Sequence, residues 1–137
     1  MSNALINTQD NFMTNEIHQS FYSVKAETQE EKIKLFNSIN NPKHRLADFI
    51  NKKIKVKDVL VEMVELENET TGEVEKCPRI ILIDDKDESY QCVSLGVFSA
   101  LKKIFVLFGV PTWDKAISIE IKQVTRKERK MLTLELV

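Results

Sequence analysis

The clearest feature of the sequence is an alternation of apolar and polar residues over much of its C-terminal part. Neighbouring side chains of a strand point to opposite faces, so this alternation predicts strands that are buried on one face. Polar turns at residues 68–72 and 84–88 separate the first runs, and Gly72 can adopt a positive φ. The runs predict five strands, over residues 54–67, 74–83, 89–94, 117–122 and 131–136.

The first of these strands changes its phase. Ile54 and Val56 fall on one face, whereas Val59 and Val61 fall on the other. This pattern predicts either a bulge near residues 57–58 or a strand that is partly buried on both faces. A strongly bent first strand is what the closure of a small barrel requires.

Between the third and fourth strands the pattern changes to the helical period. Ser94 can cap the predicted helix, and Gly109 and Pro111 end it. We expect its phenylalanines to belong to the core, because they share the apolar stripe of the helix. The stripe consists of Val97, Phe98, Leu101, Ile104, Phe105 and Phe108.

The N-terminal part is organised differently. Residues 1–20 are polar with scattered apolar residues at no clear period, so they predict an arm. After a short strand-prone run at residues 21–25, Thr28 and Glu31 have the spacing of a capping box. The helix that they begin ends before Pro42, and one helical turn is expected over residues 46–51.

The order of three strands, a helix and two strands is that of an oligonucleotide/oligosaccharide-binding (OB) fold. We therefore predict a mainly β chain, with an N-terminal arm and helix at residues 1–41 and an OB-fold domain at residues 42–137. The alternatives are another small barrel, such as an SH3-like one, and an open sheet with the helix packed on it.

Composition narrows the class of protein. The chain has 137 residues, 42% of them apolar, and a formal net charge of −1, so it can build one core but has no bulk positive potential. Cys77 and Cys92 lack the spacing of a disulfide framework or a zinc site, which favours a reducing, cytoplasmic setting. No apolar run is long enough to span a membrane, and the N-terminus does not resemble a secretion signal.

Candidate catalytic groups are scarce. The only histidines are His18 and His44, no Ser or Cys lies in a nucleophile motif, and the three glycines are isolated. The acidic run at residues 84–88 lacks the glycine and the closing glutamate of a calcium loop, and a solvated turn explains it better. We therefore predict a protein that is not an enzyme and uses no metal or cofactor.

Charge is segregated along the chain. Basic residues precede and begin the first strand, acidic residues fill residues 58–75, and a second basic cluster occupies residues 126–130. The second cluster lies between strands four and five, in one of the loops with which OB folds bind ligands. A basic turn alone is often only solvated, but two such clusters on converging elements favour contacts with phosphates.

Binding of single strands also needs aromatic rings on which bases stack. Tyr90 and Trp113 are the candidates, and Arg79 could add a charge or a stacking plane. Trp113 could equally close the open end of the barrel core. The residues predicted to bind nucleic acid are Lys43, Arg45, Lys53, Lys55, Lys57, Arg79, Tyr90, Trp113, Arg126, Lys127, Arg129 and Lys130.

Four segments resemble the small single-stranded-DNA-binding proteins of Gram-positive phages and conjugative plasmids. They are residues 40–51 (NNPKHRLADFIN), 54–59 (IKVKDV), 78–80 (PRI) and 94–98 (SLGVF), and the resemblance covers most of the chain from about Phe21 onward. It implies an OB fold that coats single-stranded DNA with little sequence preference, and an N-terminal arm that links neighbouring protomers. No Gly/Pro-rich tail with an acidic tip follows the last strand, so recruitment of partners through such a tail is not expected.

We therefore predict a protein that coats and protects single-stranded DNA during phage or plasmid replication or transfer. The main alternative is a protein-interaction module on the same fold, which would use the acidic hairpin and the apolar arm to bind replication or transfer proteins. A third reading is binding of RNA, for which the chain offers no distinguishing feature.

Overall fold

The computed structural model describes residues 20–137, so the predicted arm lies almost entirely outside the described residues. The five predicted strands are present as β3 to β7, and the predicted helix between the third and fourth of them is α3. The described elements are β1 Ser20–Tyr22, α2 Gln29–Asn40, β2 His44–Arg45, the 3-10 turn η1 Leu46–Phe49, β3 Lys53–Glu67, β4 Val74–Asp84, β5 Ser89–Val93, α3 Leu95–Phe108, β6 Ile117–Arg126 and β7 Arg129–Leu136.

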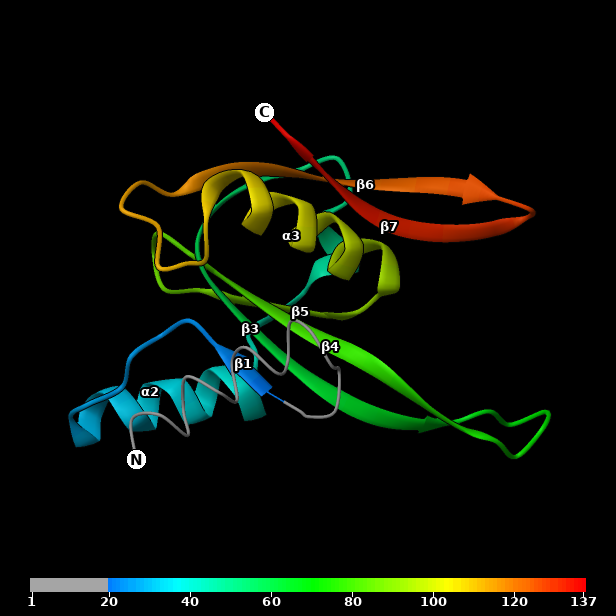
Figure 1. Ribbon diagram of the computed structural model, residues 1–137, viewed down its shortest axis with the longest axis horizontal. Coiled ribbons are helices and arrows are strands. Elements are labelled where there is room, and N and C mark those ends of the chain that lie inside the picture. Colours follow the sequence, from blue (N-terminus) through cyan, green and yellow to red (C-terminus); the bar gives the residue numbers. More distant parts are fainter. Residues whose placement is uncertain (1–19) are drawn as a thin grey trace.

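All strands of the described residues belong to one curled sheet in the order β2-β5-β4-β3-β6-β7, with β1 added to β3 (Figure 1). The long β3 pairs with β4 through one part of its length and with β6 through another. These are the pairings of an OB fold, so this prediction is confirmed. Within residues 20–137, β5 and β7 do not pair with each other, so the structure is a half-open barrel.

The change of phase in β3 has both of the predicted causes. The register with β4 shifts between Val56 and Asp58, which is the signature of a bulge. Beyond the bulge β3 is also buried on both faces, because Val59 and Val61 belong to the main core while Leu60 belongs to a second cluster on the outer face. The bulge thus lets one strand serve the barrel interior and an outer layer.

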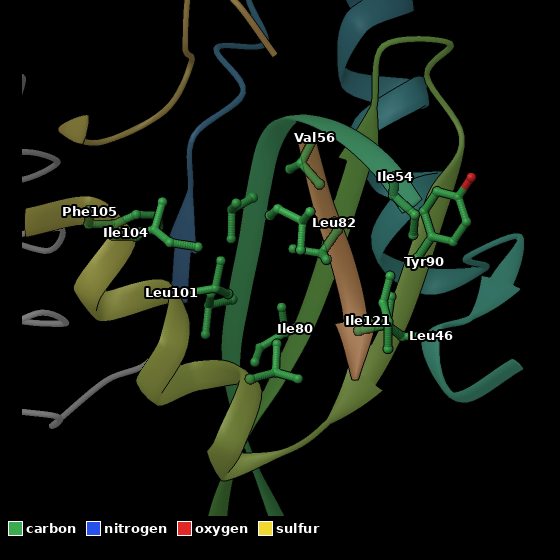
Figure 2. Close-up of a cluster of buried hydrophobic side chains, with 14 of the residues drawn as sticks. Leu46, Ile54, Val56, Ile80, Leu82, Tyr90, Leu101, Ile104, Phe105 and Ile121 are labelled. Carbon is green, nitrogen blue, oxygen red and sulfur yellow. The ribbon is translucent and has the colours of Figure 1, made fainter. Parts of the chain in front are cut away.

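The main core lies between the sheet and α3. Figure 2 shows Leu101, Ile104 and Phe105 of α3 near the strand side chains of this core. Phe21 of β1 is only 2% exposed, and its ring centroid lies 5.7 Å from that of Phe105. The short N-terminal strand is therefore part of the barrel core, whereas the division of the chain at residue 41 remains a prediction.

The first turn of α3 packs tightly against β7. A Cβ atom added to Gly96 would lie 2.2 Å from the carbonyl oxygen of Leu132. No side chain fits between these two backbones, so glycine is required for the close approach. In this way α3 bridges the gap that β5 and β7 leave open.

The predicted helix starts are confirmed. The Thr28 hydroxyl accepts a hydrogen bond from the Glu31 backbone at 3.1 Å, and the Glu31 carboxylate accepts one from the Thr28 backbone at 3.1 Å. Ser94 caps α3 by accepting from the Val97 backbone at 3.2 Å. Both helices thus begin where a side chain satisfies a free N–H group.

One part of the predicted core is wrong. Phe98 and Phe105 pack in the core, but Phe108 is 52% exposed. Its neighbours Val106 and Leu107 are exposed as well, so the last three residues of α3 lie outside the core. Gly109, with φ of 83°, then ends the helix.

Candidate nucleic-acid interface

A row of hydrogen-bonded polar side chains crosses the outer face of the sheet. At its centre on β4, the Arg79 guanidinium donates to Oε1 of Glu62 at 3.0 Å and to Oε1 of Gln91 at 3.1 Å. The Tyr22 hydroxyl donates to the other oxygen of Glu62 at 3.5 Å. Arg45 of β2 continues the row beside Gln91, because these residues are in register. Two predicted site residues, Arg45 and Arg79, therefore share one face.

Helix α2 covers the adjoining part of this outer face. Its side chains Leu35 and Ile39 pack against the outer cluster of Leu60, Ile81 and Ile83. None of the helix residues is itself buried. The helix thus limits the open part of the face to the region around the polar row.

An ion-pair cluster fixes the edge of α2. The Asp87 carboxylate lies 2.6 Å from Nζ of Lys34 and also pairs with Nζ of Lys57. Hydrogen bonds from Lys34 and Lys57 hold the pKa of Asp87 below its usual value. Lys57, a predicted phosphate contact, is therefore already partly neutralised within the protein.

Lys43 has a similar partner. Its Nζ atom lies 2.9 Å from Oε1 of Glu88, and Nε2 of His44 lies 3.3 Å from the same oxygen. The hydrogen bond from Lys43 lowers the pKa of Glu88, and the same contact raises the pKa of Lys43. Lys43 is exposed, so it can exchange this partner for another anion.

Lys53 and Lys55 point outward from the first half of β3. Their neighbours across the strand pair are Glu120 and Ser118 of β6. Both lysines are exposed. They lie before the bulge, on the part of β3 that pairs with β6, and not beside Arg79.

The second basic cluster forms the tip of the β6–β7 hairpin. Arg126 and Arg129 face each other as the last pair of the ladder, and Lys130 follows opposite Thr125. The predicted loop is only the two-residue turn Lys127-Glu128, with φ of 49° and 67°. Positive φ at both central residues matches the twist of a tight hairpin, so the tip presents its charges on a short projecting ribbon.

The acidic stretch forms a second projecting ribbon. The β3–β4 hairpin extends beyond the barrel on the same side as the β6–β7 hairpin (Figure 1). The two ribbons carry opposite charge, and among residues 20–137 no ion pair joins their exposed tips. The exposed acids of the β3–β4 ribbon are Glu65, Glu67, Glu69, Glu73 and Glu75.

The structure does not support Tyr90 as a stacking platform. The side chain is 6% exposed and its hydroxyl donates to Oδ2 of Asp84 at 2.8 Å. Its ring stacks on His44 at 4.8 Å and meets Phe49 edge to face at 5.0 Å. Burial also raises the pKa of Tyr90. Tyr90 lies on the inner face of β5, because the neighbouring Gln91 faces outward.

Trp113 is also buried, which fits the alternative prediction that it closes the end of the barrel core. It is 8% exposed, and its ring lies 6.0 Å from Phe105 in an edge arrangement. Its Nε1 atom donates to the Gly109 carbonyl oxygen at 3.0 Å. Trp113 thus closes the core at the end of α3, with no ring face open to a base.

Sequence reasoning missed Tyr22 as an aromatic ring on the outer face. Phe21 and Tyr22 alternate along β1, so the burial of Phe21 directs Tyr22 outward. That alternation was the available signal. Gln91 was missed for a different reason: in the five-residue β5, alternation alone does not say whether Tyr90 or Gln91 faces the core.

The comparison with protein families shows which family the chain matches. The family model described as phage single-stranded DNA-binding protein matches residues 13–137. The chain belongs to this family. The search of curated proteins and the search of solved structures gave no match. The match confirms the predicted relationship to phage single-stranded DNA-binding proteins. It does not test the predicted relationship to proteins of conjugative plasmids.

Family membership gives the protein its function, binding of single-stranded DNA in phage replication. The family consists of DNA-binding proteins and not of enzymes. In residues 20–137 no three His, Cys, Asp or Glu side chains are grouped as metal ligands. The described helices include none that is long and apolar enough to cross a membrane.

Proposed function

We propose that the chain coats and protects single-stranded DNA with little sequence preference, and that it acts in the cytoplasm without enzymatic activity. The bound DNA strand would lie across the outer face of β4 and β5, between α2 and the β6–β7 tip. The observation that supports this path most strongly is the row centred on Arg79, which places a guanidinium at the middle of the face where OB folds hold oligonucleotides.

Each group on this path has a chemical role. Arg45 and Arg79 would contact phosphates or stack on bases, and the ring of Tyr22 would provide an aromatic surface. The basic tip supplies further phosphate contacts from the second ligand-binding loop. The tip residues in this role are Arg126, Lys127, Arg129 and Lys130.

The remaining predicted cations have a lesser part in this proposal. Lys53 and Lys55 are exposed but lie before the bulge, on the part of β3 that pairs with β6, where they can attract the flanking DNA. Lys43 and Lys57 would need to exchange Glu88 and Asp87 for phosphates. Because such an exchange gains little net charge interaction, we assign the charge-driven affinity mainly to Arg45 and the tip. Arg79 is itself paired with Glu62, so its main part is to offer a guanidinium plane on which a base can stack.

We further propose that residues 1–20 link neighbouring protomers on the DNA, and that replication proteins are possible partners. The acidic β3–β4 ribbon favours a second candidate function, docking of a basic replication or transfer protein. Its exposed carboxylates would repel DNA phosphates and attract a basic surface. This candidate requires binding to protein in the absence of DNA.

Fluorescence anisotropy with labelled oligonucleotides tests the proposal. Single-stranded and double-stranded DNA of several sequences, and single-stranded RNA, would be titrated at two salt concentrations. We expect salt-sensitive binding of single-stranded DNA that varies little with sequence and exceeds binding of duplexes. Equal affinity for duplexes, or a strong dependence on sequence, would contradict the proposed mode.

A further inference from the structure

A groove of about 470 Å³ lies between α3 and the β6–β7 hairpin, away from the polar row of the outer face. Figure 1 shows α3 running beside these two strands. The close approach of Gly96 to Leu132 fixes one end of the helix against β7. The groove is therefore built by rigid elements of the fold. Its volume lies in the range of ligand sites.

The surface of this groove is aliphatic and open. Leu95 and Leu107 are 66% and 75% exposed, and Leu136 is 40% exposed. Val124 and Met131 of the hairpin add to the same apolar surface. A contiguous exposed apolar surface of this kind marks a contact site.

The charges and side chains at the groove select its ligand. The charged residues that line it are Lys103 and Arg126, both basic, and no acid lines it. Its described lining also includes no aromatic ring on which a base could stack. The groove thus fits an apolar peptide with acidic residues better than it fits a single strand of DNA.

The sequence before β1 has this chemistry. Residues 1–19 contain the acids Asp10 and Glu16 and no lysine or arginine. They also contain the large apolar residues Leu5, Ile6, Phe12, Met13 and Ile17. The segment is therefore complementary to the groove in both hydrophobicity and charge.

We propose that residues 1–19 of one copy bind in the α3–β7 groove of a second copy. A segment of this length spans up to about 60 Å when extended, which exceeds the diameter of about 40 Å expected for a domain of this size. The segment can therefore reach a neighbour bound next to it on the same strand. This inference rests on the proposed self-association of protomers and names the surface that receives the N-terminal segment.

Two pairs of adjacent residues on α3 provide matched variants. Leu107 lines the groove and Val106 does not, although Val106 is 84% exposed. Lys103 lines it, whereas Lys102 lies over the Phe98 ring at 4.8 Å. The variants Leu107→Glu and Lys103→Glu, with controls Val106→Glu and Lys102→Glu, therefore change the groove and the neighbouring helix surface separately.

The experiment titrates a labelled peptide of residues 1–19 into each full-length variant and measures anisotropy. We expect Leu107→Glu to weaken peptide binding at least about tenfold relative to Val106→Glu, because a carboxylate is costly against an apolar surface. Lys103→Glu should weaken it more than Lys102→Glu does. Equal peptide affinities within either pair, or no peptide binding at all, would overturn the groove as the receptor.

Light scattering over a range of protein concentrations, with and without long single-stranded DNA, tests whether the contact joins two copies. Self-association should be lost in Leu107→Glu and kept in Val106→Glu.

A full-length Phe12→Ser/Met13→Ser variant distinguishes the proposed self-association through the N-terminal segment from the proposal that the groove receives this segment. If it alone loses self-association, the segment acts but the groove is wrong; if it still self-associates, the proposed role of the segment fails. Peptide binding by a chain that stays monomeric would place the segment in its own groove and overturn the proposal. Binding of short oligonucleotides, measured in parallel, tests the DNA-binding face independently.

Discussion

The guanidinium of Arg79 and the carboxylate of Glu62 lie 3.0 Å apart across the outer face of the sheet, from β4 to β3. Both side chains are only partly exposed, at 17% and 27%. The same carboxylate that orients Arg79 also places a negative charge where the phosphates of DNA are proposed to lie. Glu62 therefore favours DNA binding by orienting Arg79 and disfavours it by repelling the phosphates.

The variant Glu62→Gln tests this balance. It removes the negative charge but keeps a hydrogen-bond acceptor for Arg79, so affinity for short single-stranded oligonucleotides should rise by about two- to tenfold at low salt. Anisotropy titrations measure this change. Glu120→Gln is the matched control, because Glu120 pairs with Lys122 at 2.5 Å on β6. A loss of affinity in Glu62→Gln would mean that orientation of Arg79 outweighs the repulsion.

The ring of Tyr22 is expected to stack on a base. Tyr22→Leu should therefore reduce short-oligonucleotide affinity by about 1–3 kcal/mol, the usual value of one base on an aromatic side chain. Phe36→Leu is the control, since Phe36 is 60% exposed on α2 and lies outside the polar row. Both affinities can be measured in one anisotropy series. Equal affinity of the two variants would remove Tyr22 from the proposed path.

The basic tip of the β6–β7 hairpin is expected to set much of the salt dependence. Each phosphate contact on a single strand contributes about 0.7 to the slope of log affinity against log salt. Replacing all four cations of the tip by alanine should therefore lower the magnitude of this slope by up to about 3. Glu128→Lys in the same turn should steepen it instead. An unchanged slope in the alanine variant would exclude the tip from the site. The four replaced residues are Arg126, Lys127, Arg129 and Lys130.

The local parts of this fold could be predicted because their causes are local. Thr28 and Glu31 form a capping box within four residues, and Ser94 caps the next helix in the same way. The strands could be predicted from period-two patterns. The bulge near residue 57 could be predicted because the pattern itself changes phase there.

The candidate site was harder to predict because it depends on register between strands. Tyr90 and Gln91 are neighbours in a strand of five residues, and alternation alone does not say which of them faces the core. The partner of Arg79 is Glu62 on another strand, and only the pairing of β3 with β4 brings them together. Charge counts along the chain therefore located basic segments but not the cations that are already paired.

The contact between α3 and β7 predicts a strong effect of one methyl group. Gly96→Ala places a Cβ atom against the Leu132 backbone, which cannot move without shifting β7. Overpacking of this kind costs about 1–3 kcal/mol, so the urea midpoint should fall clearly. Ser99→Ala, at an exposed position on the same helix, should change stability little. An unaltered midpoint in Gly96→Ala would show that helix and strand are not in close contact.

The cluster around Asp87 predicts a pH dependence of stability. Lys34 and Lys57 depress the pKa of Asp87 in the folded protein, so folding favours its ionised form. The stabilisation is complete well above the pKa of about 3.9 of an unfolded aspartate. It is lost as the pH falls toward the lower folded pKa, where the carboxylate is protonated in both states.

Urea unfolding between pH 6 and about pH 3 measures this loss. Wild type should be more stable than Asp87→Asn at the upper end, and the difference should shrink as the carboxylate is protonated. Asp85→Asn, an exposed change in the same turn, should follow the wild-type curve. Because Lys34 belongs to α2, hydrogen exchange of α2 should accelerate in Asp87→Asn even near neutral pH. If exchange of α2 is the same in both proteins, the ion pairs do not hold the helix on the sheet, and α2 depends on Leu35 and Ile39 alone.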